Sequence, residues 1–225
     1  MQVAALYDVH GNLPALEAVL ADLEREPVDA IVFGGDIAAG PFPRETVELV
    51  RSLDAVSIRG NADRLDTPAE GVWDEARLWI EEQLGEEAVA WLAALPFSAV
   101  LDDVLYVHAT PGSDEEIVTE LTSKGRVAAI LADVEERLVV AGHTHMQLRR
   151  GRFVNAGSVG RPYEGRPGAY WALIGDGVEF RRTDYDLDRA AAAVRATSYP
   201  RAEDVASQNI LRVPTREEGL EAFGV

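Results

Sequence analysis

The sequence predicts an α/β fold, because buried-strand and helix patterns alternate along the first part of the chain. Residues 3–7 and Ala30–Phe33 are continuous apolar runs, which are typical of strands covered on both faces. Between them, Leu13–Leu23 repeats leucine and valine at helical spacing. Residues 46–53 are expected to form a helix and residues 55–58 a third short strand. This order predicts a parallel sheet with helices on its faces.

The remainder of the chain changes pattern. From residue 147 to 183, short apolar runs are separated by glycine, proline and an Asp-Gly pair at 176–177, which is typical of antiparallel hairpins. No repeat, low-complexity tract or linker is visible, so we expect a single domain over residues 1–225 with two sheets. Its other expected elements are a helix at 74–95, strands at Val104–Val107 and Leu138–Ala141, helices at 126–132 and 187–196, and a partly helical C-terminal tail from about residue 188.

Composition limits the classes of function. The 225 residues are 47% apolar and 27% charged, enough for an ordinary core, in which Trp73, Trp79 and Trp91 are expected to pack. The chain has no cysteine, which excludes disulfides, thiolate zinc sites, iron–sulfur clusters and cysteine nucleophiles. A formal net charge of −18 repels nucleic-acid backbones and anionic lipids, so we expect no specific nucleic-acid binding. A small phosphorylated substrate stays compatible, because a bound divalent metal can reverse the local field.

No targeting or membrane segment is expected. The N-terminal residues lack the charged and apolar regions of a secretory signal. The longest nearly apolar run, residues 88–101, is broken by Pro96 and is too short to span a bilayer. We therefore expect a cytoplasmic protein without membrane association. The oligomeric state is open, because the apolar residues of the tail can pack on the domain or on a partner subunit.

All four histidines of the chain follow directly on predicted strands. Two further predicted strands run into an aspartate and an asparagine. Because the carboxyl ends of parallel strands meet at one edge of a sheet, we expect all these side chains to gather there. Together with the aspartate of an Asp-Val-His triplet, the candidate metal ligands are Asp8, His10, Asp36, Asn61, His108, His143 and His145.

The types and number of these side chains indicate which metal they suit. Asp8 and His10, like His143 and His145, are two residues apart, so each pair projects to the same side of an extended backbone. Imidazole, carboxylate and amide ligands without sulfur are typical of sites for Mn, Fe, Co, Ni or Zn. Seven ligands are too many for one tetrahedral ion and suit two ions about 3.5–4 Å apart, with Asp36 as the bridge. Such a pocket keeps a positive charge that attracts phosphate.

In this order the motifs resemble the signature of the calcineurin-like metallophosphoesterase superfamily, which reads D-x-H, G-D, G-N-(H/D), a lone H and G-H-x-H. Further stretches are similar to its small prokaryotic YfcE-type branch. They are HGNLPAL from His10, Ala109-Thr110-Pro111 after the lone histidine, and NAGSVGRP from Asn155. The resemblance covers about residues 1–186. The signature stands here as Asp8-Val9-His10, Gly35-Asp36, Gly60-Asn61, His108 and Gly142-His143-Thr144-His145.

The resemblance implies a four-layer αββα sandwich of two mixed β-sheets flanked by helices. It also implies two divalent metal ions, with manganese expected first, and attack on phosphorus by a bridging water or hydroxide. A phosphodiesterase is the leading expectation. A dinucleoside polyphosphate or nucleotide hydrolase, and a non-catalytic metal-binding interaction module, are the alternatives. By analogy, Asp8, His10, Asp36 and His145 hold the first metal, and Asp36, Asn61, His108 and His143 hold the second.

One position departs from the family pattern. Many relatives carry a histidine after the asparagine of the G-N motif, where it is assigned the protonation of the leaving group, but Ala62 stands here. General acid catalysis is worth about 10²–10⁴-fold. We therefore expect slow turnover of esters with poor leaving groups and better turnover of activated esters. The neighbouring Asp63 more often orients a histidine in the family, so the acid stays unassigned.

Two more residues are candidates for substrate contact. Asn12 either caps the helix that begins at Leu13 or touches the substrate. Arg161 follows a glycine-spaced loop and is either a surface arginine or part of the pocket. Several arginines near the predicted hairpins are expected to protect sheet edges rather than to bind nucleic acid, namely Arg149, Arg150, Arg152, Arg181 and Arg182.

Overall fold

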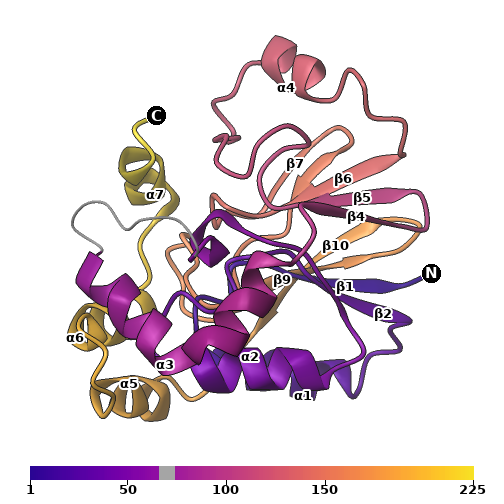
Figure 1. The fold of residues 1–225 in the computed structure, drawn as a ribbon. Helices are drawn as coiled ribbons and strands as arrows, with labels where there is room; N and C mark the ends of the chain where they lie inside the picture. Colours follow the sequence, from indigo (N-terminus) through magenta and orange to yellow (C-terminus); the bar gives the residue numbers. More distant parts are fainter. Residues whose placement is uncertain (66–73) are drawn as a thin grey trace.

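Two five-stranded sheets face each other in the computed structural model, and helices cover both outer faces (Figure 1). The structure describes residues 1–65 and 74–225, so Trp73, expected in the core, lies outside the described residues. Both sheets are mixed: three neighbouring strands of each run parallel, and the antiparallel strands lie at one edge of the first sheet and at both edges of the second. The fold class that the sequence predicts is confirmed.

The first sheet is built around the N-terminal strand. The Asp176-Gly177 pair lies between two antiparallel strands of this sheet, as predicted. In spatial order, the strands are β10 (Val178–Thr183), β9 (Ala169–Ile174), β1 (Val3–Leu6), β2 (Ala30–Phe33) and β3 (Val56–Ser57). The three strands β1, β2 and β3 run parallel, whereas β9 and β10 are antiparallel to their neighbours. A parallel centre of this kind points three strand ends to one side.

The second sheet repeats this plan with the middle of the chain. Its strands, in spatial order, are β4 (Ser98–Leu101), β5 (Val104–Val107), β6 (Leu138–Ala141), β8 (Phe153–Asn155) and β7 (Leu148–Arg150). Here β5, β6 and β8 are parallel, and the edge strands β4 and β7 are antiparallel. Strand β4 was not expected from the sequence, because its four residues end the nearly apolar run 88–101, and the apolar pattern alone does not separate them from the helix before Pro96.

Strand β1 shows why apolar runs form the central strands. Its side chains alternate between the two faces of the sheet and are buried on both. Ala4 and Leu6 pack towards the covering helices, while Val3, Ala5 and Tyr7 pack into the layer between the two sheets. The hydroxyl of Tyr7 donates a hydrogen bond of 2.8 Å to the carbonyl of Val140, which joins the two sheets.

The helices form the outer layers and one end of the molecule. In Figure 1, α1, α2 and α3 lie along the outer face of the first sheet, α4 lies on the second sheet, and α5, α6 and α7 lie at the end opposite the N-terminus. No described helix is long and apolar enough to cross a membrane. The helices are α1 (Leu13–Leu23), α2 (Pro43–Ser52), α3 (Asp74–Ala93), α4 (Lys124–Ile130), α5 (Leu187–Arg195), α6 (Ala202–Val205) and α7 (Arg216–Ala222), with a 3₁₀ turn η1 (Asn61–Asp63) and a π-helical segment η2 (Ala206–Leu211).

Helices α2 and α3 differ from the sequence prediction for local reasons. Helix α2 begins at Pro43 rather than at residue 46, because proline fits the first helical position, where no N–H is needed. Helix α3 is interrupted at Gly85, whose φ of +72° is not helical. Glycine adopts this conformation without steric cost. The apolar pattern continues on both sides of Gly85, which is why the sequence predicted one uninterrupted helix.

The arginines near the hairpins have two roles: one lies exposed on a sheet edge, and another holds a loop by hydrogen bonds. Arg149 is exposed on the edge strand β7, as expected for edge protection. Arg150, however, donates hydrogen bonds to the carbonyls of Thr119, Glu120 and Thr122. Such bonds hold the loop before α4 against the sheet.

Candidate metal centre

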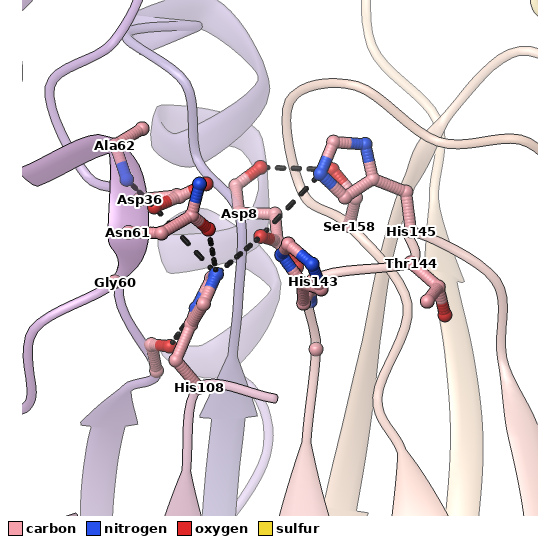
Figure 2. Close-up of polar contacts among 12 residues, drawn as sticks. Asp8, Asp36, Gly60, Asn61, Ala62, His108, His143, Thr144, His145 and Ser158 are labelled. Carbon is pink, nitrogen blue, oxygen red and sulfur yellow. Dashed lines mark hydrogen bonds and ion pairs between the residues drawn. The ribbon is translucent and has the colours of Figure 1, made fainter. Parts of the chain in front are cut away.

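The seven predicted ligands gather where the parallel strands of both sheets end, and Figure 2 labels all of them except His10. In this view the strands rise towards the cluster and end just below it. Both sheets contribute, which explains how residues far apart in the sequence meet. The positions are Asp8 and His10 after β1, Asp36 after β2, Asn61 after β3, His108 after β5, and His143 and His145 after β6.

Four of these residues form a tight group. Ligand atoms of Asp8, His10, Asp36 and His145 all lie within 4.8 Å of one another. The Nε2 atoms of His10 and His145 are 3.0 Å apart. The Nε2 atom of His145 lies 3.4 Å from Oδ1 of Asp8, and that of His10 lies 3.6 Å from Oδ2 of Asp36. This is the set that the family resemblance assigns to the first metal.

The remaining three residues lie together, and one of them, His108, is near the other oxygen of Asp36. His108 Nε2 lies 2.9 Å from Oδ1 of Asn61 and 3.6 Å from Oδ1 of Asp36. The ring of His143 is 5.2 Å from the ring of His108. The two oxygens of Asp36 therefore face different histidines, one from each group. A carboxylate in this position is suited to bridge two cations.

Backbone carbonyls determine which ring nitrogens point lone pairs into the cluster. Nδ1 of His108 lies 2.9 Å from the carbonyl of Gly34, and Nδ1 of His145 lies 2.7 Å from that of Arg161. A carbonyl oxygen can only accept, so both Nδ1 atoms carry the proton. The Nε2 atoms of both rings therefore point into the cluster, where each lies near a carboxylate oxygen. Metal-binding histidines are held by their second nitrogen in this way.

One carboxylate oxygen of Asp8 has no hydrogen-bond partner, and this indicates that a metal fits the donor set. Oδ2 of Asp8 accepts a hydrogen bond of 2.9 Å from the backbone N–H of His143. Oδ1 of Asp8 is buried and accepts no hydrogen bond. A buried carboxylate oxygen without a partner is costly, and a cation removes this cost. Because Oδ1 faces the imidazole nitrogens, the residues fit a divalent transition metal.

Charge and burial shift the pKa values in the cluster in opposite directions. Burial raises the pKa of the Asp36 carboxyl to about 7. Burial and the neighbouring His108 lower the pKa of His143 to about 4, and burial also lowers the pKa of His10. Burial lowers the pKa of His108 too, but the carboxylates of Asp36 and Asp8 raise it more, so the net shift is upward. The neutral forms of His10 and His143 are those that bind metal.

Backbone conformation at the cluster is strained. Among the described non-glycine residues with positive φ, all but Asp102 and Asp103 of the β4–β5 turn are predicted ligands. Left-handed conformations cost free energy and concentrate at functional sites. The ligands concerned are Asp8 (+53°), His10 (+48°), Asp36 (+53°), His143 (+68°) and His145 (+56°).

Two glycines allow the ligand loops to approach closely. A Cβ atom on Gly60 would lie 2.2 Å from Oδ1 of Asp36, and one on Gly142 would lie 2.4 Å from Oδ2 of Asp8. Neither distance is compatible with a side chain. These glycines therefore leave room for the ligand carboxylates, and a larger residue would displace them.

Asp63 holds two ligand loops together, a role that the sequence did not reveal. Its carboxylate is fully buried and accepts backbone hydrogen bonds from Asp36 (2.7 Å), Ile37 (3.0 Å) and Gly60 (3.0 Å). The only signal was its place two residues after Asn61. With both oxygens occupied by N–H donors, Asp63 is a positioning residue.

The loop that carries His143 and His145 is held by Asn155. This side chain donates to the carbonyl of Gly142 and to Oγ1 of Thr144. It accepts from the backbone N–H of Gly157 at 2.9 Å. Its contacts support the loop rather than the cluster directly.

The two candidate substrate residues differ in their surroundings. Asn12 caps α1 by accepting from the N–H of Ala15, and its amide donates to the carbonyl of Gly160 at 3.0 Å. The expected capping role of Asn12 is confirmed, and its contact with substrate stays a prediction. Arg161 lines a cavity of about 470 Å³ beside the cluster, together with His10, Asp36 and Asn61. A contact between Arg161 and a bound phosphate also stays a prediction.

Comparison with models of known protein families identifies the family of this chain. The model of the calcineurin-like phosphoesterase superfamily domain matches residues 1–175. The chain belongs to the calcineurin-like phosphoesterase superfamily. The resemblance drawn from the motifs is thereby confirmed, and the superfamily is one of metal-dependent hydrolases.

Similar proteins share this superfamily fold over most of their length. A solved metallophosphoesterase from Sphaerobacter thermophilus is 29% identical, with a TM-score of 0.77 over 94% of this chain and 98% of that one. The hypothetical protein PH1004 from Pyrococcus horikoshii is 24% identical, with a TM-score of 0.79 over 92% and 96% of the two chains. The uncharacterized protein MJ0912 of Methanocaldococcus jannaschii is 26% identical over 219 residues, covering 84% of this chain and 89% of that protein.

Proposed function

We propose that this member of the superfamily is a dinuclear metal-dependent phosphoesterase that acts on phosphodiesters or other activated phosphate esters. The position of Asp36 carries the proposal. Its Oδ2 faces His10 and its Oδ1 faces His108, so a single carboxylate is shared between two groups of ligands. A mononuclear site would not need ligands on both sides of one carboxylate.

The residues divide into two sets around Asp36. Asp8, His10 and His145 would hold one ion with Oδ2, while Asn61, His108 and His143 would hold the other with Oδ1. Divalent ions bound in such a pair lower the pKa of water and neutralise charge that develops on phosphoryl oxygens. Manganese is the first choice among the metals that suit this donor set.

The protein itself contributes orientation. The carbonyls of Gly34 and Arg161 fix the rings of His108 and His145, and the N–H of His143 fixes the carboxylate of Asp8. Because these side chains are preorganised, they do not have to reorient during the reaction. A phosphate ester in the adjoining cavity would meet the ligand groups already in place.

The preference for activated esters rests on Ala62 and Asp63. Ala62 lines the cavity and has no proton to donate. Both carboxylate oxygens of Asp63 accept hydrogen bonds from backbone N–H groups, so this residue does not supply the acid. With neither side chain able to protonate a leaving group, esters whose leaving group departs as a stable anion are favoured.

The complete set of ligands argues for an enzyme over a binding module. An interaction module on this scaffold has no need for strained backbone at five ligand positions. All seven metal-capable side chains are present, and four of them have ligand atoms within 4.8 Å of one another. This supports catalysis at the cluster.

Hydrolysis of bis-p-nitrophenyl phosphate by chelator-stripped protein tests the proposal. We expect turnover only after Mn²⁺ is added back, and a loss of more than about 100-fold in Asp36→Asn. The matched control is Asp133→Asn, since Asp133 is exposed and distant from the ligands in sequence. No turnover with Mn, Fe, Co, Ni or Zn, in protein that is folded, would overturn the phosphodiesterase proposal.

A further inference from the structure

Helix α7 places an aromatic side chain against the metal centre. Phe223 follows this helix, and its ring lies 6.0 Å from the ring of His143. The same ring meets Tyr163 edge-on, at 5.9 Å and 85°. Tyr163 in turn stacks on His145 at 5.4 Å and 15°. The four rings form an aromatic wall that runs from one predicted ligand to another.

This aromatic wall faces the cavity rather than the core. Tyr163 and Phe223 both line the cavity of about 470 Å³ that also contains His143 and His145. Both aromatic rings are only half-buried. The neighbouring lining includes Leu65 and other apolar side chains. An apolar surface left open beside charged ligands is typical of a binding site.

The contacts of α7 hold Phe223 in a defined place. The guanidinium of Arg216 forms ion pairs with Glu120 at 2.9 Å and with Glu164 at 3.0 Å. A Cβ on Gly219 would lie 2.9 Å from the Tyr163 side chain, so the helix backbone packs directly on that tyrosine. The helix and Tyr163 are thus fixed to each other.

From these contacts we infer that Phe223 and Tyr163 form a recognition surface for a planar aromatic group carried by the phosphate ester. The inference rests on the proposed function, because it places the phosphate at the metal centre. Aromatic rings bind planar groups by offset stacking or edge-to-face contact. The substrates are then aryl or nucleotide esters rather than esters of small alkyl alcohols.

Ala62 agrees with this substrate class. It lines the same cavity, so the space next to the metal centre offers no proton donor at that place. Aryl oxides, and nucleotide phosphates released by cleavage of a phosphoanhydride, are weaker bases than alkoxides and leave without protonation. A site that binds planar aromatic esters therefore has less need of the missing histidine.

The test is calorimetric binding of three phosphonates to Mn²⁺-loaded protein. Phenylphosphonate and cyclohexylphosphonate have similar size, but only the first is planar, and methylphosphonate lacks the group altogether. We expect phenylphosphonate to bind roughly two- to tenfold more tightly than cyclohexylphosphonate. In Phe223→Ala this preference should disappear, while the affinity for methylphosphonate stays unchanged.

Two further variants separate the wall from the helix. Glu221→Gln, at an exposed position of the same helix, should keep the preference for phenylphosphonate. Arg216→Ala releases α7 and should lose the preference as Phe223→Ala does. Equal binding of phenyl- and cyclohexylphosphonate by the unmodified protein, or a preference that survives in Phe223→Ala, would overturn the inference and leave the metal centre standing.

The remaining outcomes separate this inference from the proposed function. If no phosphonate binds to the folded, Mn²⁺-treated protein, the proposed phosphate site itself fails, and the inference fails with it. Adenosine 5′-monophosphate and ribose 5-phosphate distinguish two sources of the planar group. A preference for the nucleotide that depends on Phe223 indicates a base, whereas a Phe223-dependent preference for phenylphosphonate alone indicates an aryl ester.

Discussion

The Nε2 atoms of His10 and His145 lie 3.0 Å apart, although 135 positions separate the residues in the sequence. Nδ1 of His145 donates to the carbonyl of Arg161, so the Nε2 lone pair of His145 points at Nε2 of His10. Without a metal, an Nε2–H of neutral His10 fits as the donor between them, whereas a metal ion in place of that proton could be bound by both nitrogens. Burial lowers the pKa of His10 and so favours the neutral ring, which is the form that binds metal.

Metal binding is expected to stabilise the folded protein, because the ligands are brought together only in the folded state. A ligand that binds only the folded state adds about 2.7 kcal/mol at a concentration 100 times its Kd. Calorimetric melting of stripped protein should therefore show a higher Tm after Mn²⁺ is added. In His10→Ala the increase should be smaller. An unchanged Tm in the original protein would contradict this.

The affinity for Mn²⁺ is expected to rise with pH around neutrality. Burial raises the pKa of Asp36 to about 7 in the metal-free protein, and its proton has to leave before the carboxylate binds a cation. The raised pKa of His108 acts with the same sign. With a pKa of about 4, His143 is already neutral in this range and adds no slope. Calorimetry in buffers of different ionisation enthalpy should detect the release of protons when Mn²⁺ binds. An affinity for Mn²⁺ that does not change with pH would contradict the role of Asp36 as a ligand.

The substitution Asp63→Asn is expected to weaken both the fold and the metal centre. Asparagine turns an amide N–H₂ towards a backbone N–H that Asp63 now accepts, leaving a buried donor unpaired. We expect a loss of about 1–3 kcal/mol in the free energy of unfolding. Because Asp63 positions Asp36, Mn²⁺ affinity should fall by about 10–100-fold.

Urea denaturation in the presence of a chelator measures the first effect, and Mn²⁺ titration measures the second. The exposed Asp133→Asn serves as the control, and it should leave both quantities unchanged. If Asp63→Asn is as stable as the control, its three hydrogen bonds do not support the ligand loops.

Replacing Ala62 by histidine is expected to help poor leaving groups selectively. General acid catalysis contributes about 10²–10⁴-fold, so kcat/KM for diethyl phosphate, whose leaving group is an alkoxide, should rise by up to about 100-fold. The value for bis-p-nitrophenyl phosphate should change little, because nitrophenolate leaves without a proton. Ala62→Gln controls for size. Equal changes for both substrates would show that protonation is not what the site lacks.

Sequence patterns predicted the central strands well, because burial on both faces leaves a continuous apolar signal. Ala30–Phe33, Val104–Val107 and Leu138–Ala141 have the bounds that were expected. Strand β4 at Ser98–Leu101 was missed, because it exists through pairing with β5 at a sheet edge. Edge pairing is a tertiary property that a short polar-apolar segment does not reveal.

The same division applies to the candidate site. The seven ligand positions follow strand ends, so local patterns and the rule for parallel sheets were enough to bring them together. Tyr163 and Phe223 were not expected there. Their place depends on the docking of α7 through Arg216, a contact between distant segments. In the sequence alone, Phe223 is one apolar residue of a tail that could pack anywhere.

The most direct test of the dinuclear site is the number of Mn²⁺ ions bound per chain, measured by elemental analysis after equilibrium dialysis while ester hydrolysis is followed. The account predicts two ions per chain, with turnover appearing as the second ion binds. His108→Ala should retain one ion and His10→Ala should retain the other. One ion or none in the folded, unmodified protein would contradict the shared role of Asp36.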